Sequence, residues 1–402
     1  MERDPCASET FQLRGFAVSL YELAILGNAS RQERDRLTGT ITEMTRDFGL
    51  TVGNELVILD AGGIADRNRR AAFAAAYFGG DPTTDAAAVA ELIRTSAVVI
   101  PTVASGGDFE TEIPQALRSA NGHRRRANDV DMNELAAALL ECLGLLRVQR
   151  RVFLSYRRTE ARAAALQLHD RLLERTFDVF LDTHDIRPGQ PFQEVLFHRL
   201  CDSDVLLMLD TPTYFARMWT RQELGRALAK GIHILRVVWP DHEPTPEASL
   251  AETIVLDPTE MGGPDGPIPQ TRVDQIALAL EKVRSRSIAA RYMAVTGKLR
   301  EDLTRIGGSI DAIGSHRAIA ITLPTRKKVW AYPVVGFPTA ELLNDVADKA
   351  AKADQEGTPI LVYDEVGMSQ PWVAHLKWLD ENISSVRALK ASTIGYDLVA
   401  WE

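Results

Sequence analysis

The sequence has few of the features that mark secreted, membrane-spanning or metal-binding proteins. Its 402 residues include only three cysteines, Cys6, Cys142 and Cys201, without the spacing of a metal site. An odd, small number of cysteines favours a reducing compartment over a disulfide framework. No apolar run approaches the roughly 20 residues that span a bilayer, and residues 1–15 lack the apolar core of a signal peptide. We therefore expect a cytoplasmic protein with no membrane partner.

Acidic residues outnumber basic ones, and known ligand-binding spacings are scarce. The formal net charge is −9 at pH 7, which argues against general electrostatic attraction to nucleic acid. The eight histidines show no spacing such as H-E-x-x-H, so no metal is expected. Residues 59–73 contain two adjacent glycines but not the spaced three-glycine dinucleotide fingerprint, and we interpret them as a loop. Any anion must therefore be held by a local arrangement of side chains.

The middle of the chain alternates short apolar runs with helical patterns. Alternation of this kind predicts a parallel sheet covered by helices on both faces, with ligands bound beyond the carboxyl ends of the strands. A last helical pattern over 272–286 closes this unit. The predicted strands are 152–156, 177–182, 204–210, 233–239 and 252–257.

The N-terminal part of the chain reads as a degenerate copy of this middle unit. Residues 91–103 resemble 198–210, and residues 111–122 resemble 220–231. With this alignment, Pro114 falls over Glu223, so the copy would lack a carboxylate there. The alternative, that any two strand–helix segments look alike at this level, stays open.

The C-terminal part follows a third pattern, which we interpret as a small α/β accessory domain. A helix near 288–305 precedes it, and helices are expected between its strands. We therefore expect three domains, at 1–148, 149–287 and 288–402. The predicted strands of the last one are 316–324, 327–336, 358–367 and 396–401.

Several short motifs of the middle unit together resemble the TIR domain, the Toll/interleukin-1 receptor module. They are "RVFLSYRR" from 151, "FDVFLD" from 177, the Pro-Gly loop before Phe192, and "WTRQEL" from 219. None is decisive alone, but their order is that of the family. The resemblance implies a flavodoxin-like parallel sheet over 149–287 and, for the prokaryotic type, cleavage of NAD⁺.

The resemblance assigns the catalytic role to one carboxylate, Glu223, on the helix after the third strand. One carboxylate suffices because nicotinamide leaves as a neutral molecule, whereas ordinary glycosidases need a second carboxyl group to protonate their leaving group. The remaining task is to stabilise positive charge developing on the ribose. Trp219 precedes Glu223 by four residues and lies on the same helix face, where it would form a pocket wall. The alternative for Glu223 is a solvated helix glutamate.

The paired arginines, Arg157 and Arg158, follow the first strand of the middle unit, where an open parallel sheet binds ligands. Their planar guanidinium groups suit the pyrophosphate of a dinucleotide, and the resemblance places both beside NAD⁺; a basic surface pair is the alternative. The other expected substrate-binding residues are Ser155, Tyr156, Asp182 and Phe192, with Phe192 stacking on a ring.

The resemblance further implies self-association through TIR domains. Loop 183–192 has a partly fixed shape because it contains three Pro and Gly residues, and we expect it to complete the site of a neighbouring subunit. NAD⁺ is then a substrate, not a cofactor. The product is ADP-ribose or a cyclic ADP-ribose, in a defence response such as that against phage, with a trigger sensed by 1–148 or 288–402. Two rival functions stay open: a non-enzymatic TIR adaptor and an enzyme similar to a nucleoside deoxyribosyltransferase.

Overall fold

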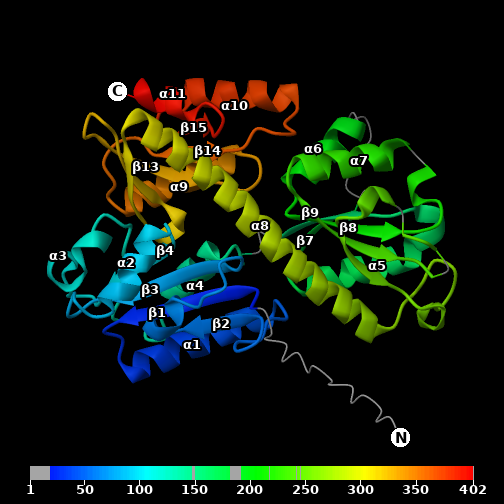
Figure 1. The fold of residues 1–402 in the computed structure, drawn as a ribbon, viewed down its shortest axis with the longest axis horizontal. Coiled ribbons are helices and arrows are strands. Elements are labelled where there is room, and N and C mark those ends of the chain that lie inside the picture. The colour runs from blue at the N-terminus through cyan, green and yellow to red at the C-terminus, as the bar shows by residue number, and fades with distance from the viewer. Residues whose placement is uncertain are drawn as a thin grey trace, which may run out of the picture.

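A computed structural model of the chain describes residues 19–146, 150–181, 192–216, 218–240, 242–244 and 246–401. Within these ranges, side chains are described except at 192–195, 218–220, 222, 223 and 247. Three five-stranded sheets succeed one another along the chain (Figure 1). None of the described helices has the length and apolar character needed to cross a membrane.

The first sheet is entirely parallel, in the order β2-β1-β3-β4-β5. Its first helix begins with a capping box, in which Ser30 and Glu33 bond each other's backbone N–H groups. The strands are β1 (Tyr21–Gly27), β2 (Leu56–Leu59), β3 (Ala72–Phe78), β4 (Val98–Val103) and β5 (His123–Arg124). The helices are α1 (Arg31–Arg46), α2 (Ala86–Arg94), α3 (Phe109–Glu112) and α4 (Asn133–Cys142), with short 3₁₀ turns η1 (Ala61–Ile64) and η2 (Gln115–Leu117).

The second sheet is also parallel, in the order β10-β9-β8-β6-β7. Its strand β8 is an apolar run buried at every position, as expected for a sheet covered on both faces. The strands are β6 (Arg151–Ser155), β7 (Asp178–Leu181), β8 (Val205–Asp210), β9 (His233–Val238) and β10 (Glu252–Val255). The helices are α5 (Arg158–Glu174), α6 (Phe192–Asp202) and α7 (Met218–Ala229), with 3₁₀ turns η4 (Tyr214–Ala216), η5 (Pro246–Ala248) and η6 (Pro258–Glu260).

The first two sheets share one topology. Counted in chain order within each sheet, both run 2-1-3-4-5, which is the flavodoxin-like order. The parallel α/β fold predicted for the middle unit is therefore confirmed. The N-terminal unit repeats the same strand order in front of it.

The third sheet is mixed, in the order β11-β12-β13-β14-β15. The first two pairings, β11–β12 and β12–β13, are antiparallel and the remaining two are parallel. The strands are β11 (Ser309–Ile313), β12 (Ile319–Thr322), β13 (Lys328–Pro333), β14 (Ile360–Tyr363) and β15 (Arg387–Lys390). The helices are α9 (Ala340–Lys352), α10 (Gln370–Asn382) and α11 (Ile394–Val399), with the turn η7 (Ser315–Arg317).

Two expectations for the C-terminal part were wrong. The segment expected as a final strand, 396–401, mostly lies in α11, because Ile394 and Leu398 are spaced one helical turn apart and both are buried. The last strand is β15 instead, a short edge strand. The two helices expected at 272–286 and 288–305 are one helix, α8 (Gln270–Ile306), which ends at Gly307 in the left-handed conformation that glycine favours.

Helix α8 joins the three sheets (Figure 1). Its first half supplies buried residues such as Val273 and Leu280 to the core of the second sheet. Its second half supplies Val295, Leu299 and Leu303 to another core, which contains residues of both the first and the third sheet. The first and third sheets therefore share one continuous hydrophobic core.

Candidate active site

The carboxyl ends of β6 and β8 lie side by side, because these strands are parallel neighbours in the second sheet. β6 ends at Ser155, whose hydroxyl is 2.7 Å from the phenol oxygen of Tyr214. Both side chains are buried, each 2% exposed. This hydrogen bond ties the end of β6 to η4, on the connection from β8 to α7. Ser155 therefore anchors the floor of the predicted site, and Tyr156 beside it is also buried.

The two arginines occupy different environments at the start of α5. Arg157 is the residue that precedes the helix, and its Nη1 donates to the carbonyl oxygen of Thr213 over 3.0 Å. Its Nε is 3.4 Å from Oε1 of Glu160. Arg158 is the first residue of the helix and is exposed. The structure thus places both arginines at the predicted edge of the sheet, with Arg157 held by other protein groups.

Glu160, which the sequence analysis did not single out, completes this arrangement. Its carboxylate accepts hydrogen bonds from the backbone N–H of Thr213, at 3.2 Å, and from the Thr213 hydroxyl. Partial burial acts to raise the pKa of Glu160, but hydrogen bonds from Thr211 and Thr213 and the charge of Arg157 outweigh it and lower the pKa. Glu160 is therefore ionised near neutral pH and binds both Arg157 and the connection from β8 to α7.

A buried carboxylate also stands at the end of β8. Asp210 is fully buried, and its Oδ1 is 3.2 Å from Nε2 of His242, while Arg236 approaches its Oδ2 to 3.8 Å. The only signal for Asp210 in the sequence was its place at the end of an apolar run. Its partners on and after β9 could not be recognised from spacing, because they lie more than 20 residues along the chain.

Several predicted site residues can be placed only in part. Trp219 and Glu223 lie four residues apart in α7, the helix that follows β8 as expected, and Phe192 is the first residue of α6. The side chains of Trp219, Glu223 and Phe192 are outside the described part of the structure. Asp182 lies outside the described residues altogether. Their roles stay predictions. Within the described ranges, no group of three or more His, Cys, Asp or Glu residues is arranged to hold a metal ion.

The alignment of the N-terminal unit needs correction, because β3 lies in a segment that was not recognised as a strand. Four of the seven β3 residues are alanine, which is depleted in strands, and all seven are buried. By strand order β3 matches β8, so α2 matches α7. Ser96 and Gly231 both have positive φ in equivalent turns that bond back to these helices.

Matching Ser96 to Gly231 places Ala88, not Pro114, over Glu223, since each lies eight residues before its turn. Ala88 is buried on the inner face of α2. The corrected alignment still puts no carboxylate at this position of the N-terminal unit. An inactive N-terminal copy therefore stays our prediction, now for a different reason.

The described part of the predicted site, at the edge that carries Arg157, lies away from the other two units. Contacts of the second unit with the other two come from the opposite edge of its sheet, where the strands begin. Arg151 donates to the carbonyl of Val335 over 2.9 Å, and Lys230 is 2.7 Å from Asp364. Among the described residues, we find no contact between the first or third unit and the edge that carries Arg157.

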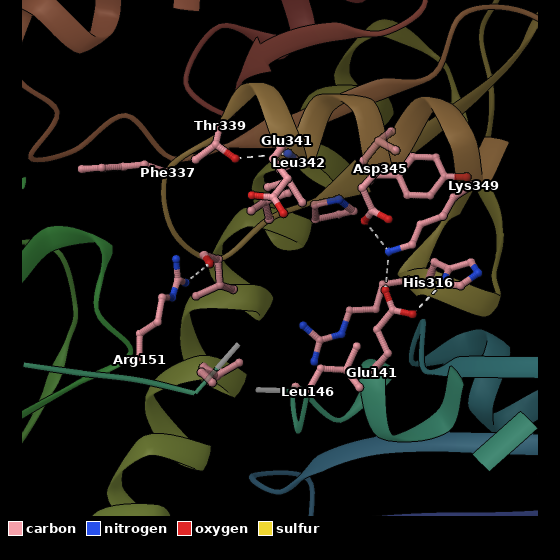
Figure 2. Close-up of a pocket in the computed structure, with 18 of the residues that line it drawn as sticks. Glu141, Leu146, Arg151, His316, Phe337, Thr339, Glu341, Leu342, Asp345 and Lys349 are labelled. Carbon is pink, nitrogen blue, oxygen red and sulfur yellow. Dashed lines mark hydrogen bonds and ion pairs between the residues drawn. The ribbon is translucent and has the colours of Figure 1, made fainter. Parts of the chain in front are cut away.

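A cavity of about 590 Å³ lies at this opposite edge, where the three units meet (Figure 2). Glu141 of α4 accepts bonds there from Lys349 and lies 2.6 Å from Nδ1 of His316. Arg151 closes another side. Burial acts to raise the pKa of Glu141, but His316 and Lys349 outweigh it and lower the pKa to about 2. The cavity is thus separated from Arg157 by the length of β6 and belongs to the contact between units.

Comparison with known proteins agrees with the architecture of the second unit. Residues 152–263 match the family described as TIR domain. This match begins in β6, passes through α7 and ends before α8. The second unit is therefore a TIR domain. A search of curated proteins finds no match for the chain.

Proposed function

We propose that the chain is an NAD⁺ nucleosidase of the prokaryotic TIR type, with Glu223 as its catalytic carboxylate. The observation that supports this most is the TIR match over 152–263, which includes Glu223 on the helix after the third strand of a 2-1-3-4-5 sheet. In the proposed reaction the nicotinamide–ribose bond breaks, and nicotinamide leaves neutral with the bonding electrons. Glu223 stabilises the cationic ribose, which water or the adenine of the same molecule then captures.

In this proposal, described and undescribed residues share the work of binding NAD⁺. Ser155 and Tyr214 form a fixed floor, and Arg157 and Arg158 lie at the carboxyl edge as cations for the pyrophosphate. Trp219 and Phe192 would hold the nicotinamide and Asp182 would line the floor. We place the enzyme in the cytoplasm as a defence effector, with its trigger sensed by the first or third unit.

We expect activity to depend on self-assembly. We infer that a neighbouring TIR domain completes the site edge through loop 183–192, most of which lies outside the described residues. Contacts between unlike surfaces do not have to close into a ring. When they stay open, they build filaments. Size-exclusion fractions incubated with NAD⁺ at equal subunit concentration should release nicotinamide at least about tenfold faster from large species than from monomer. Equal rates per subunit would refute assembly, and no nicotinamide from any fraction would favour an adaptor.

The arginine pair distinguishes this proposal from a nucleoside deoxyribosyltransferase. Changing both Arg157 and Arg158 to Ala should raise the KM for NAD⁺ by about 100-fold, because charged hydrogen bonds of ~1.5–3 kcal/mol each are lost, less in solvent. If the protein were a nucleoside deoxyribosyltransferase, the same double substitution would leave its activity on nucleosides unchanged, because nucleosides contain no pyrophosphate. The measurement is nicotinamide release and base exchange on deoxyadenosine in the same preparations. Changing the exposed Arg300 and Arg305 of α8 to Ala serves as control.

A further inference from the structure

We propose that Glu160 is an internal substitute for the substrate's pyrophosphate, which holds Arg157 against the β8–α7 connection until NAD⁺ displaces it. This inference rests on the proposed function, whose site it regulates. It assigns a role to a residue that neither the TIR motifs nor the predicted catalytic chemistry require.

Three residues contact one another at the carboxyl edge of the second sheet. Arg157 bonds the Thr213 carbonyl, Glu160 accepts two bonds from Thr213, and Arg157 and Glu160 pair with each other. The side chains of Arg157 and Glu160 are 27% and 24% exposed, so a ligand can reach both. We call these three residues the latch.

The latch joins two elements that border the predicted site. Arg157 and Glu160 belong to the start of α5, whereas Thr213 precedes η4 and α7, the helix of Glu223. α5 departs from helical geometry at Ala161 (φ −142°, ψ 21°), immediately after Glu160. Its first turn is thus geometrically distinct from the rest of the helix, so this turn can shift while the buried remainder stays packed.

Arg157 is bound incompletely in this state. Its buried Nε has no hydrogen-bond partner among the described residues and makes only the 3.4 Å ion pair. A phosphate can accept two parallel bonds from one guanidinium, which is the stronger arrangement. Glu160 also lies in the first turn of a helix, where the backbone favours negative charge. A pyrophosphate entering this position therefore competes with the Glu160 carboxylate for Arg157. It also competes for the favourable backbone dipole at the start of α5.

Glu160→Gln tests the latch, because it keeps the side-chain shape and removes the charge. The matched control is Glu174→Gln, at the other end of α5, where Glu174 pairs with Arg171 three residues earlier. We would titrate each full-length protein with ADP-ribose, which contains the pyrophosphate and undergoes no nicotinamide cleavage, by calorimetry. We expect Glu160→Gln to bind about tenfold more tightly, equivalent to ~1.4 kcal/mol, and Glu174→Gln to match the unaltered protein.

The outcomes separate the latch from the proposed function. Equal or weaker binding by a folded Glu160→Gln protein, or no binding by any of the three, overturns the latch. Tighter binding without NAD⁺ cleavage by any preparation supports the latch and contradicts the nucleosidase. With active enzyme, we expect Glu160→Gln to lower the KM for NAD⁺ about tenfold. An unchanged KM with Glu223-dependent cleavage would leave the nucleosidase in place and remove the latch.

Discussion

Replacing Glu223 with glutamine should reduce NAD⁺ cleavage by about 100-fold to 1,000-fold, the loss typical when one preorganised electrostatic group is removed from an active site. Glutamine has nearly the same shape, but it cannot offset the positive charge that develops on the ribose. The effect should fall on kcat more than on KM, because this charge exists only in the transition state. Nicotinamide release by assembled protein at saturating NAD⁺ measures it.

The control for this prediction is Glu301→Gln, an ordinary helix glutamate. Glu301 pairs with Arg305 one turn later in α8, and its side chain is 72% exposed. Its substitution should leave the rate within about twofold. A Glu223→Gln protein that retains more than a tenth of the activity, with an unchanged unfolding transition, would show that Glu223 is not the catalytic carboxylate.

Glu281→Ala is expected to lower the free energy of unfolding by about 3–5 kcal/mol, because it leaves buried arginines without their counter-charge. Glu281 on α8 is 3.1 Å from Arg150 and 2.8 Å from Arg284, and it accepts a hydrogen bond from the hydroxyl of Tyr21 on β1. Both arginines are fully buried. The cluster therefore joins the TIR domain to the first sheet, and the urea midpoint of unfolding should fall accordingly.

Acid should weaken the same cluster. Burial acts to raise the pKa of Glu281, but Arg150 and Arg284 outweigh it and lower the pKa from 4.5 to about 2. A carboxyl group with a lowered pKa stabilises the fold fully above its unfolded value, and this contribution is lost as the pH falls from about 4.5 toward 2. The difference between the unaltered protein and Glu281→Ala should therefore shrink in acid.

A surface glutamate with two arginine partners provides the comparison. Glu91 is 2.7 Å from Arg69 and 2.9 Å from Arg94, which are 54% and 66% exposed. Water screens these pairs, so Glu91→Ala should lower the urea midpoint far less than Glu281→Ala does. If Glu91→Ala and Glu281→Ala lower the urea midpoint equally, burial does not make the Glu281 cluster more stabilising than a surface ion pair.

The sequence was most informative where one physical signal dominates. Apolar runs such as 204–210 alternate with helical patterns, and they predicted the parallel sheet because strands buried on both faces have such runs. The alanine-rich strand β3 was missed, since its burial follows from the helices that cover it and not from its own propensity. A boundary between two helices was predicted near Arg286, but α8 continues through it, because neither Gly nor Pro stands there to end a helix.

The candidate site was predictable in its position but not in its internal contacts. The place of Arg157 and Arg158 follows from the end of one strand. The partner of Arg157 does not, because Thr213 approaches from a segment more than 50 residues away. Glu160 is close in sequence, yet its role depends on that same approach. Ion pairing between distant segments is a property of the packed structure, and spacing along the chain does not encode it.

The shared core of the first and third sheets has a consequence for how this protein can be dissected. In chain order the TIR domain is an insertion between two halves of one body, entered after residue 146 and left along α8. Deleting either terminal half would uncover apolar faces such as those of Ile319 and Leu139, which belong to one cluster, and the remainder would aggregate. Inactivity of such a deletion would then reflect a broken scaffold, not a missing sensor. Point substitutions at the three-way cavity, which leave that scaffold whole, are the informative route to the trigger.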